Sequence, residues 1–379
     1  MRIGLVAPVW CSVPPAGYGG TEQVLDALAR GLRELGHDVV LATTADSTCP
    51  VPRVSLLRSP AAPIGAQLPE LRHVLHAHEQ LADCDVIHDH TLSGPLLAVG
   101  RRTGPPVVTT CHGELSGELG DYYRQLSRHV AVIGISHAQV SAAPGVAHAV
   151  VHHGLVPEDF PFGRGEGGHL LFLGRMSPDK GADRAVRAAR AAGVPLLLAA
   201  KMREPAELEY FARHVEPLLG EEAHYLGEVD FATKTSLLAS ARALLVPIRW
   251  PEPFGMVMIE ALACGTPVLA FPEGAAPEVV EHRRTGFLCR DEADMAAAVG
   301  RLSELSREDC RDAVERRFSA RRMAAEHVRV YRSAIARRNL PRPAHQLHPP
   351  RQPVDLHPPV VIDLDVDRRA AERHPAQPQ

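Results

Sequence analysis

Residues 169–181 read HLLFLGRMSPDKG, a short apolar run followed by a loop that contains glycine. The apolar run has the length of a strand that is buried on both faces, and the segment 182–192 beyond the loop has the period of a helix. Apolar runs alternate with helix-period segments through most of the chain on both sides of this stretch. The pattern predicts an α/β fold, in which helices cover parallel sheets.

The expected strands fall into two successive series. The first series comprises residues 2–7, 38–43, 85–89, 106–110, 131–135 and 149–152. The second series comprises residues 169–174, 195–200, 223–226, 243–247 and 267–271. Helices are expected at residues 21–35 and 182–192, between the other strands, and over most of residues 291–338. Two series indicate two doubly wound domains, which we place at residues 1–155 and 156–318.

The end of the chain has a different composition. Residues 341–379 include nine prolines and four histidines among 39 residues. A segment of this kind cannot bury a core, so we predict a disordered Pro/His-rich tail, with a short interaction motif as the alternative.

Composition and charge exclude several classes of protein. Of the 379 residues, 45% are hydrophobic, which excludes a wholly disordered or fibrous protein. A formal net charge of −4 argues against nucleic-acid binding through bulk positive charge. The seven cysteines include no CxxC pair, which favours a reducing compartment over a disulfide framework or a zinc ribbon. No apolar stretch reaches the ~20 residues that span a bilayer, and residues 1–6 resemble a strand rather than a signal peptide, so we expect a cytoplasmic protein without a transmembrane segment.

The first candidate site is the loop at residues 14–21, PPAGYGGT, because ligands of open α/β sheets bind at the carboxyl ends of strands. Gly19 and Gly20 would let the backbone approach a ligand, and the start of the next helix supplies N–H donors for a phosphate. The loop is not GxGxxG, so a nicotinamide cofactor is poorly supported. A plain tight turn is the alternative.

The second candidate site holds two cations, Arg175 and Lys180, at the start of a helix. A cation there faces the positive end of the helix dipole, which is unfavourable unless an anion lies nearby. A diphosphate would suit Arg175 as a forked donor and Lys180 as a point charge. The alternative is a pair of solvated surface cations.

The third candidate site is the segment 250–265, WPEPFGMVMIEALACG. Glu260 is the one charged residue within the apolar stretch 256–264, and a buried carboxylate is costly unless it is paired or hydrogen-bonded. Sugar hydroxyls can donate to such a carboxylate, and Glu252 lies one loop earlier, where a second sugar could bind. A salt bridge between Glu260 and a neighbouring cation is the alternative.

Several motifs occur together in a definite order. Glu252 and Glu260 form an E-x7-E pattern, with GR-x4-KG at residues 174–181 upstream and GTPV at residues 265–268 downstream. Further matches are YGGT at residues 18–21, CHGE at residues 111–114 and a TGF turn at residues 285–287. The set resembles the retaining GT-B glycosyltransferases of family 4 over roughly residues 1–338. The resemblance implies two Rossmann-like domains that face a central cleft, with a terminal helix at residues 319–338 that crosses back to the N-terminal domain.

The resemblance also implies a role for each matched residue. Arg175 and Lys180 would bind the donor diphosphate and stabilise the leaving group, and His112 would contact the transferred sugar. Glu260 would bind the ribose and Glu252 the sugar hydroxyls. The residues implied for catalysis are His112, Arg175, Lys180 and Glu252. Those implied for donor binding are Gly19, Gly20, Arg175, Lys180, Glu252, Phe254, Gly255, Met256 and Glu260.

The activity implied is that of a retaining hexosyltransferase that uses a nucleotide diphosphate sugar, most often a UDP-sugar, with no cofactor and no metal. The N-terminal domain would bind the acceptor near residues 45–65 and 113–124. The sequence does not distinguish among small-molecule, natural-product and cell-envelope glycan acceptors. It is also compatible with peripheral membrane contact. Two alternatives remain. A GT-B sugar-nucleotide epimerase is disfavoured by the E-x7-E spacing. A non-catalytic sugar-nucleotide-binding protein is disfavoured because the chain keeps all five residues on which catalysis would depend: His112, Arg175, Lys180, Glu252 and Glu260.

Histidines outside these motifs are candidate metal ligands. His88 and His90 share one face of a strand, and His152 and His153 are neighbours in the chain. No third ligand follows at a convincing spacing, so we assign no metal site. His153 also stands before Gly154 where the family commonly has asparagine, a change that we expect to affect the hinge between domains rather than the chemistry.

Overall fold

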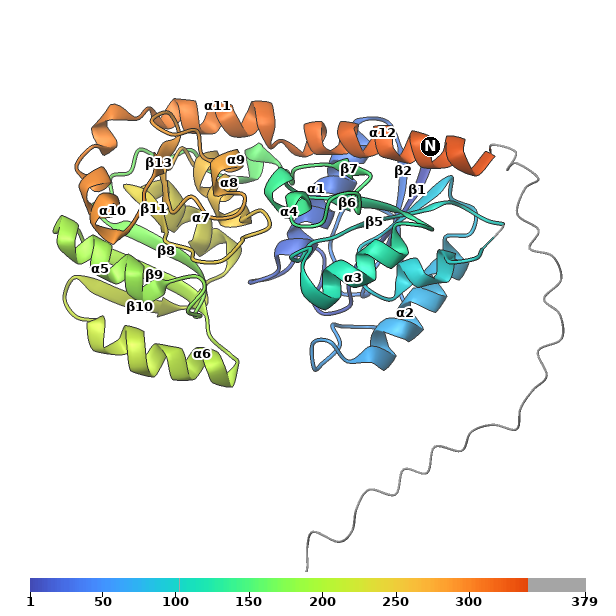
Figure 1. Cartoon of the computed structure of the whole chain (residues 1–379), viewed down its shortest axis with the longest axis horizontal. Coiled ribbons are helices and arrows are strands. Elements are labelled where there is room, and N and C mark those ends of the chain that lie inside the picture. The colour runs from blue at the N-terminus through green and yellow to red at the C-terminus, as the bar shows by residue number, and fades with distance from the viewer. Residues whose placement is uncertain (102, 340–379) are drawn as a thin grey trace, which may run out of the picture. The chain divides into compact units, whose positions relative to one another are not determined.

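The structure is a computed structural model that describes residues 1–101 and 103–339; the tail at residues 341–379, for which disorder is predicted, lies outside them (Figure 1). The described part contains two parallel β-sheets, each with helices on both faces. This arrangement confirms the predicted α/β class. Among these described residues, no helix combines the length and the apolar character that crossing a membrane requires.

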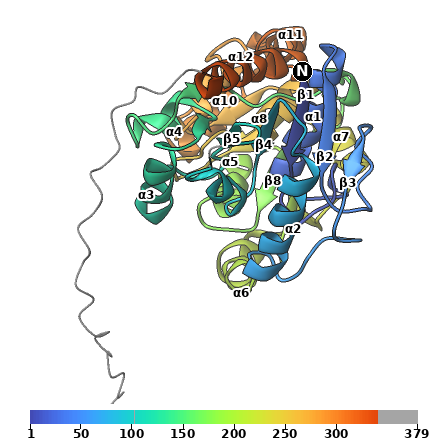
Figure 2. The same ribbon diagram turned by 90° about the vertical axis from the view of Figure 1, so that its right-hand side faces the viewer.

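The first sheet has seven strands in the order β3-β2-β1-β4-β5-β6-β7. The strands are β1 (Arg2–Val6), β2 (Asp38–Ala42), β3 (Arg53–Val54), β4 (Val86–Asp89), β5 (Val107–Thr110), β6 (Ala131–Gly134) and β7 (Ala149–Val150), and the helices are α1 (Gly20–Glu34), α2 (Gln67–Gln80), α3 (Gly117–Leu126) and α4 (His137–Ser141). Successive side chains of a strand point to opposite faces, so Leu5 packs in the core beneath α1 and Val6 in the core beneath α2 and α3. In Figure 2, α1 and α3 accordingly lie on opposite sides of β4 and β5.

The second sheet repeats the same order in six strands, β10-β9-β8-β11-β12-β13. The strands are β8 (Leu170–Arg175), β9 (Leu196–Lys201), β10 (Ala223–Gly227), β11 (Ala243–Val246), β12 (Val268–Ala270) and β13 (Gly286–Leu288). The helices are α5 (Ala182–Ala192), α6 (Pro205–Tyr210), α7 (Phe231–Ser240), α8 (Met256–Ala263), α9 (Ala276–Val279), α10 (Glu292–Val299) and α11 (Arg307–Arg317). Leu171 faces the core beneath α8 and α11, and Phe172 faces the core beneath α5 and α10.

Two short strands at or near the sheet edges were missed by the sequence analysis. These are β3 (Arg53–Val54) and β13 (Gly286–Leu288). The turn predicted at residues 285–287 is correct for Thr285 and wrong for Gly286 and Phe287, which pair with β12 as part of β13. Two or three residues are too few to show the alternation on which strand prediction depends.

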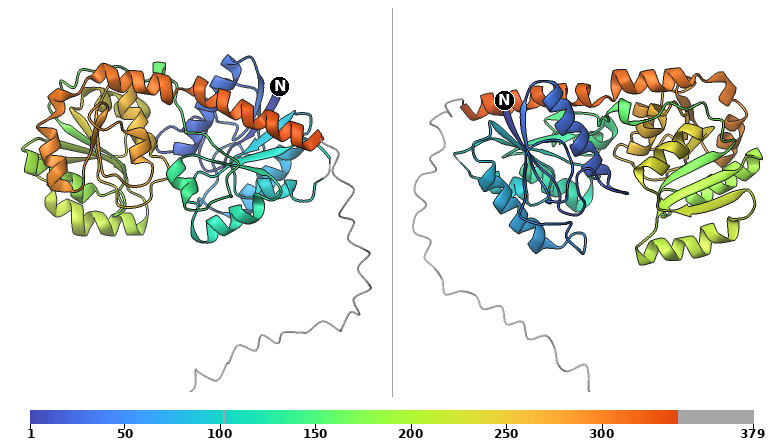
Figure 3. Two further views of the ribbon diagram at one scale, coloured as in Figure 1. Left: turned by 45° about the horizontal axis from the view of Figure 1, so that its top comes forward. Right: turned by 180° about the vertical axis from the view of Figure 1, so that it is seen from behind.

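The chain passes between the two sheets twice, after β7 and again between α11 and α12 (Ala320–Asn339). The two crossings are hydrogen-bonded to each other: Leu155 N donates to Phe318 O at 2.9 Å, and Ala320 N donates to Leu155 O at 2.7 Å. A Cβ atom at Gly154 would lie 2.6 Å from Ser319 O, so this close approach requires glycine. Beyond the crossing, α12 packs on α1 (Figures 1 and 3).

Candidate active site

A cavity of about 450 Å³ lies between residues of the two sheets. It brings together every residue that the sequence analysis assigned to catalysis or donor binding. These residues are Gly19, Gly20, His112, Arg175, Lys180, Glu252, Phe254, Gly255, Met256 and Glu260. Their roles stay predictions, but their position in one cavity is a property of the fold.

The strand orders explain why these residues converge. The order reverses between β1 and β4 in the first sheet and between β8 and β11 in the second. Loops that follow neighbouring strands diverge at such a switch point and leave a crevice at the carboxyl ends. Arg175 ends β8, Glu252 lies in the loop after β11, and His112 lies just after β5.

Two helices direct their N-termini into the cavity. Gly19 precedes α1 and Gly255 precedes α8, and within the described residues neither start has a side-chain hydrogen bond as a cap. The first N–H groups of both helices are thus available to an anion, supported by the helix dipoles. Gly255 has φ 82°, and a Cβ there would lie 2.6 Å from Met258 Cε, so glycine is required at this turn.

The two predicted phosphate-binding cations have different surroundings. The Arg175 side chain is 38% exposed, and its Nη2 lies 3.3 Å from Asp179 Oδ2. Lys180 forms an ion pair with Glu252 and lies 5.0 Å from the centroid of the Trp250 ring. Trp250 Nε1 also donates to Glu252 at 3.0 Å. The predicted diphosphate and sugar subsites are therefore adjacent.

Glu260 is only 3% exposed and pairs with Lys234 of α7, whose Nζ lies 2.8 Å from Oε1. The structure thus contains the salt bridge that the sequence analysis left open as an alternative. Lys234 also lines the cavity, so the pair faces the space that a ligand would occupy. No sequence pattern indicates Lys234; the only signal is that a buried carboxylate needs a partner.

Glu228 is a second cavity residue that the sequence analysis missed. Its carboxylate accepts from Arg203 Nη2 at 2.6 Å and from Tyr18 N at 3.2 Å. Tyr18 belongs to the glycine loop of the first sheet, whereas Glu228 follows β10 of the second. One acidic side chain therefore holds the glycine loop against the opposite half of the cavity.

His112 belongs to a group of buried imidazoles. Its Nε2 lies 2.8 Å from His90 Nδ1, and its ring stacks on that of His153 with centroids 5.2 Å apart. Burial, with a smaller contribution from His327, lowers the pKa of His112 to about 4. His112 is therefore neutral near pH 7 and can offer a hydrogen bond but no charge. His153, expected to influence only the hinge, lines the cavity.

His88 and His90, considered above as metal ligands, bind protein groups instead. His88 lies 2.8 Å from the Tyr331 hydroxyl and 2.8 Å from Thr110 Oγ1, and His90 is engaged by His112. These contacts join the middle of α12 to β4 and to the end of β5.

Sequence models of two known groups match the chain. That of Glycosyltransferase Family 4 matches residues 18–160, and that of Glycosyl transferases group 1 matches residues 167–304. The chain belongs to glycosyltransferase family 4. Like the other members, it is a transferase enzyme, and the predicted resemblance is confirmed.

Relatives of this family 4 glycosyltransferase agree with the assignment. It is 31% identical to a phosphatidyl-myo-inositol mannosyltransferase of Mycolicibacterium smegmatis, over 79% of this chain and 84% of the relative. It is 26% identical to AviGT4, a glycosyltransferase involved in avilamycin A biosynthesis, with a TM-score of 0.67 and coverage of 88% and 98%. Sucrose-phosphate synthase from Thermosynechococcus elongatus, 19% identical, shares the fold with a TM-score of 0.72 over 89% and 99% of the two chains. The GT-B fold is confirmed.

The buried imidazoles of the glycosyltransferase make its stability depend on pH. Burial, more than the neighbouring imidazoles, lowers the pKa of each member of a group of five histidines. The group consists of His88, His90, His112, His153 and His327. Between about pH 6.5 and pH 4 the unfolded chain binds more protons than the folded one, so the free energy of unfolding should fall as the pH falls through this window.

Each such histidine contributes a slope of about 1.4 kcal/mol per pH unit in this window. Urea unfolding measured from pH 7 to pH 5 should show a free energy of unfolding that falls as the pH falls. His327→Leu should make this fall less steep by about the contribution of one histidine. The exposed His129→Ala serves as the control and should leave the slope unchanged. Equal slopes for His327→Leu and the unaltered chain would contradict the assignment.

Proposed function

We propose that the protein transfers a hexose from a nucleotide diphosphate donor, with UDP as the nucleotide, to an acceptor with retention of configuration. The observation that carries the proposal is the single cavity in which Arg175, Lys180 and the starts of α1 and α8 surround a space for an anion. Glu252 and Glu260 face the same cavity with oxygens that can accept hydrogen bonds from hydroxyl groups.

In this proposal the side chains act mainly by electrostatic stabilisation. Arg175, Lys180 and the two helix starts stabilise the charge that grows on the departing diphosphate as the sugar becomes oxocarbenium-like. The leaving phosphate takes the proton of the acceptor hydroxyl on the same face of the sugar, which retains the configuration. Neutral His112 contributes a hydrogen bond to the transferred sugar. The donor diphosphate draws Lys180 away from Glu252, which frees that carboxylate for the sugar hydroxyls.

The acceptor is proposed to bind on the first-sheet side, near residues 45–65 and 113–124. Ile64 lines the cavity and is 68% exposed, and Leu68 and Leu75, two helical turns apart on α2, form an exposed apolar strip that lies close to Ile64 in the chain. Such a strip suits an acceptor with an apolar portion, whether it is a natural product or a lipid-linked glycan precursor.

A donor hydrolysis screen tests the proposal most directly. Purified protein is incubated with UDP-, GDP- and ADP-hexoses, and the release of nucleoside diphosphate is measured. We expect release from UDP-hexoses above the rate of a Lys180→Ala variant. Release from only GDP- or ADP-hexoses would show that the donor nucleotide is GDP or ADP and not UDP. The absence of release or binding for all three donors would contradict the proposed function.

Transfer is further predicted to tolerate a chelator. The loops at the carboxyl ends of the strands contain no Asp-x-Asp motif, and two cations are available for the diphosphate, so no divalent ion is needed there. Turnover in excess EDTA should equal turnover in untreated buffer. Complete loss of transfer in EDTA, restored by Mg²⁺ or Mn²⁺, would show that the diphosphate is held by metal.

A further inference from the structure

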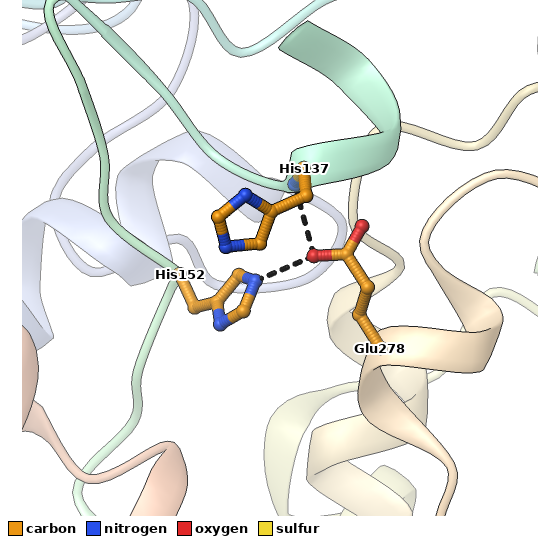
Figure 4. Close-up of side chains that lie close together, drawn as sticks. All are labelled: His137, His152 and Glu278. Carbon is orange, nitrogen blue, oxygen red and sulfur yellow. Dashed lines mark hydrogen bonds and ion pairs between the residues drawn. The ribbon is translucent and has the colours of Figure 1, made fainter. Parts of the chain in front are cut away.

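Three potential metal ligands from both halves of the chain meet outside the donor cavity. His137 begins α4 and His152 follows β7, both in the first half, whereas Glu278 lies on α9 of the second half. One ligand atom from each lies within 4.8 Å of the other two, and none of the three residues lines the cavity. Figure 4 shows the two imidazole rings on one side of the Glu278 carboxylate.

We propose that His137, His152 and Glu278 form a site for a divalent transition metal of the zinc class that ties the two halves of the chain together. Two imidazole nitrogens and one carboxylate oxygen are a ligand set that zinc accepts, with a fourth position open to water. His137 is exposed, so a metal ion can reach the site from solvent.

The distance between His152 and Glu278 requires only a small adjustment. His152 Nε2 lies 2.8 Å from Glu278 Oε2 in a direct contact. Two ligand atoms of a tetrahedral zinc ion lie roughly 3.3 Å apart, so about half an ångström of movement would admit the ion between them. Within the described part of the chain the imidazole of His137 makes no hydrogen bond, so this ring can turn toward a metal without breaking one.

The backbone supplies the outer support that a metal-binding carboxylate needs. His137 N donates to Glu278 Oε2 at 2.9 Å, and Ala138 N donates to Oε1 at 2.7 Å. These donors fix the orientation of the carboxylate and leave each oxygen a further lone pair. The sequence analysis found no third ligand for His152 because the carboxylate comes from the other half, 126 residues along the chain.

Metal binding to the full-length protein tests the site. After treatment with chelator and its removal, the protein is titrated with Zn²⁺ in a thermal-shift assay and with Co²⁺ by visible absorption. At a hundredfold excess over Kd, Zn²⁺ should raise Tm by roughly 3 °C or more, because an ion that binds only the folded chain stabilises it. Co²⁺ should show the intense bands of a low-coordinate nitrogen and oxygen site.

His137→Ala is the decisive variant, because it removes a ligand and, among the described residues, breaks no side-chain hydrogen bond. It should weaken binding at least tenfold and so reduce the Tm shift at the same Zn²⁺ concentration to about half or less, as should Glu278→Gln. His129→Ala, at an exposed histidine, is the matched control and should bind like the unaltered chain. The four tail histidines are present in every variant. If His137→Ala binds the metal as tightly as the unaltered chain, the metal binds elsewhere and the proposed site is overturned. The absence of saturable binding would also overturn it. The readout is binding, so a loss of transfer in EDTA would bear on the proposed reaction and not on this site.

Discussion

Replacing Arg175 or Lys180 with alanine is expected to lower kcat by about 10²-fold or more. Both side chains line the cavity next to the uncapped starts of α1 and α8, where the charge of the leaving diphosphate would develop. A cation that interacts more strongly with the transition state than with the bound donor lowers kcat when removed. The free energy of unfolding should change little for Arg175→Ala, because its side chain is 38% exposed. Turnover under saturating donor, with urea unfolding in parallel, measures both effects.

Arg187→Ala is the matched control for this prediction. Arg187 lies on α5, close to Lys180 in sequence, but its side chain is 48% exposed, pairs with Asp183, and does not line the cavity. Its turnover should equal that of the unaltered enzyme. An unchanged kcat in either Arg175→Ala or Lys180→Ala would remove that residue from the catalytic role.

The fold was predictable because its signal is repeated along the chain. Apolar runs of four to six residues, such as residues 170–173, alternate with helices, and each repetition supports the same α/β interpretation. The helix at residues 182–192 was predicted with the bounds that α5 has in the structure. The edge strands β3 and β13 were missed because they are held in place by pairing with a neighbour rather than by a pattern of their own.

The candidate site was predictable where its chemistry is local in sequence. Glu260 is conspicuous as one acid in an apolar helix, and Arg175 and Lys180 as cations at a helix start. Lys234, the partner of Glu260, and Glu228, the further acid of the cavity, were not predictable, because both come from separate elements that only the folded sheet brings near. The ion pair between Lys180 and Glu252 was missed for the same reason: each residue was assigned a ligand, and the structure shows that they contact each other.

Glu260→Gln and Glu252→Gln are expected to have different effects on nucleotide binding. Glu260 is proposed to bind the ribose, which every form of the nucleotide contains. Its replacement should weaken binding of UDP, UMP and the sugar nucleotide alike, by about 1–3 kcal/mol for the loss of a charged hydrogen bond. That corresponds to roughly 5- to 150-fold in Kd. Equal losses of affinity for UDP and UMP would indicate a lost ribose contact, because both nucleotides contain the ribose. A larger loss or gain for UDP would indicate instead a changed electrostatic effect of Lys234 on the phosphates.

Glu252 is proposed to bind the hydroxyls of the sugar, so Glu252→Gln should lower transfer while UDP binds at least as well as before. The structure gives a reason for unimpaired binding: Lys180, released from its ion pair, is then free to contact the diphosphate. Calorimetry with UDP, UMP and a UDP-hexose on both variants decides the matter, with Glu209→Gln on the exposed face of α6 as the control. If Glu252→Gln loses UDP and Glu260→Gln does not, the two carboxylates have the opposite roles, and the assignment of the E-x7-E pattern to ribose and sugar fails.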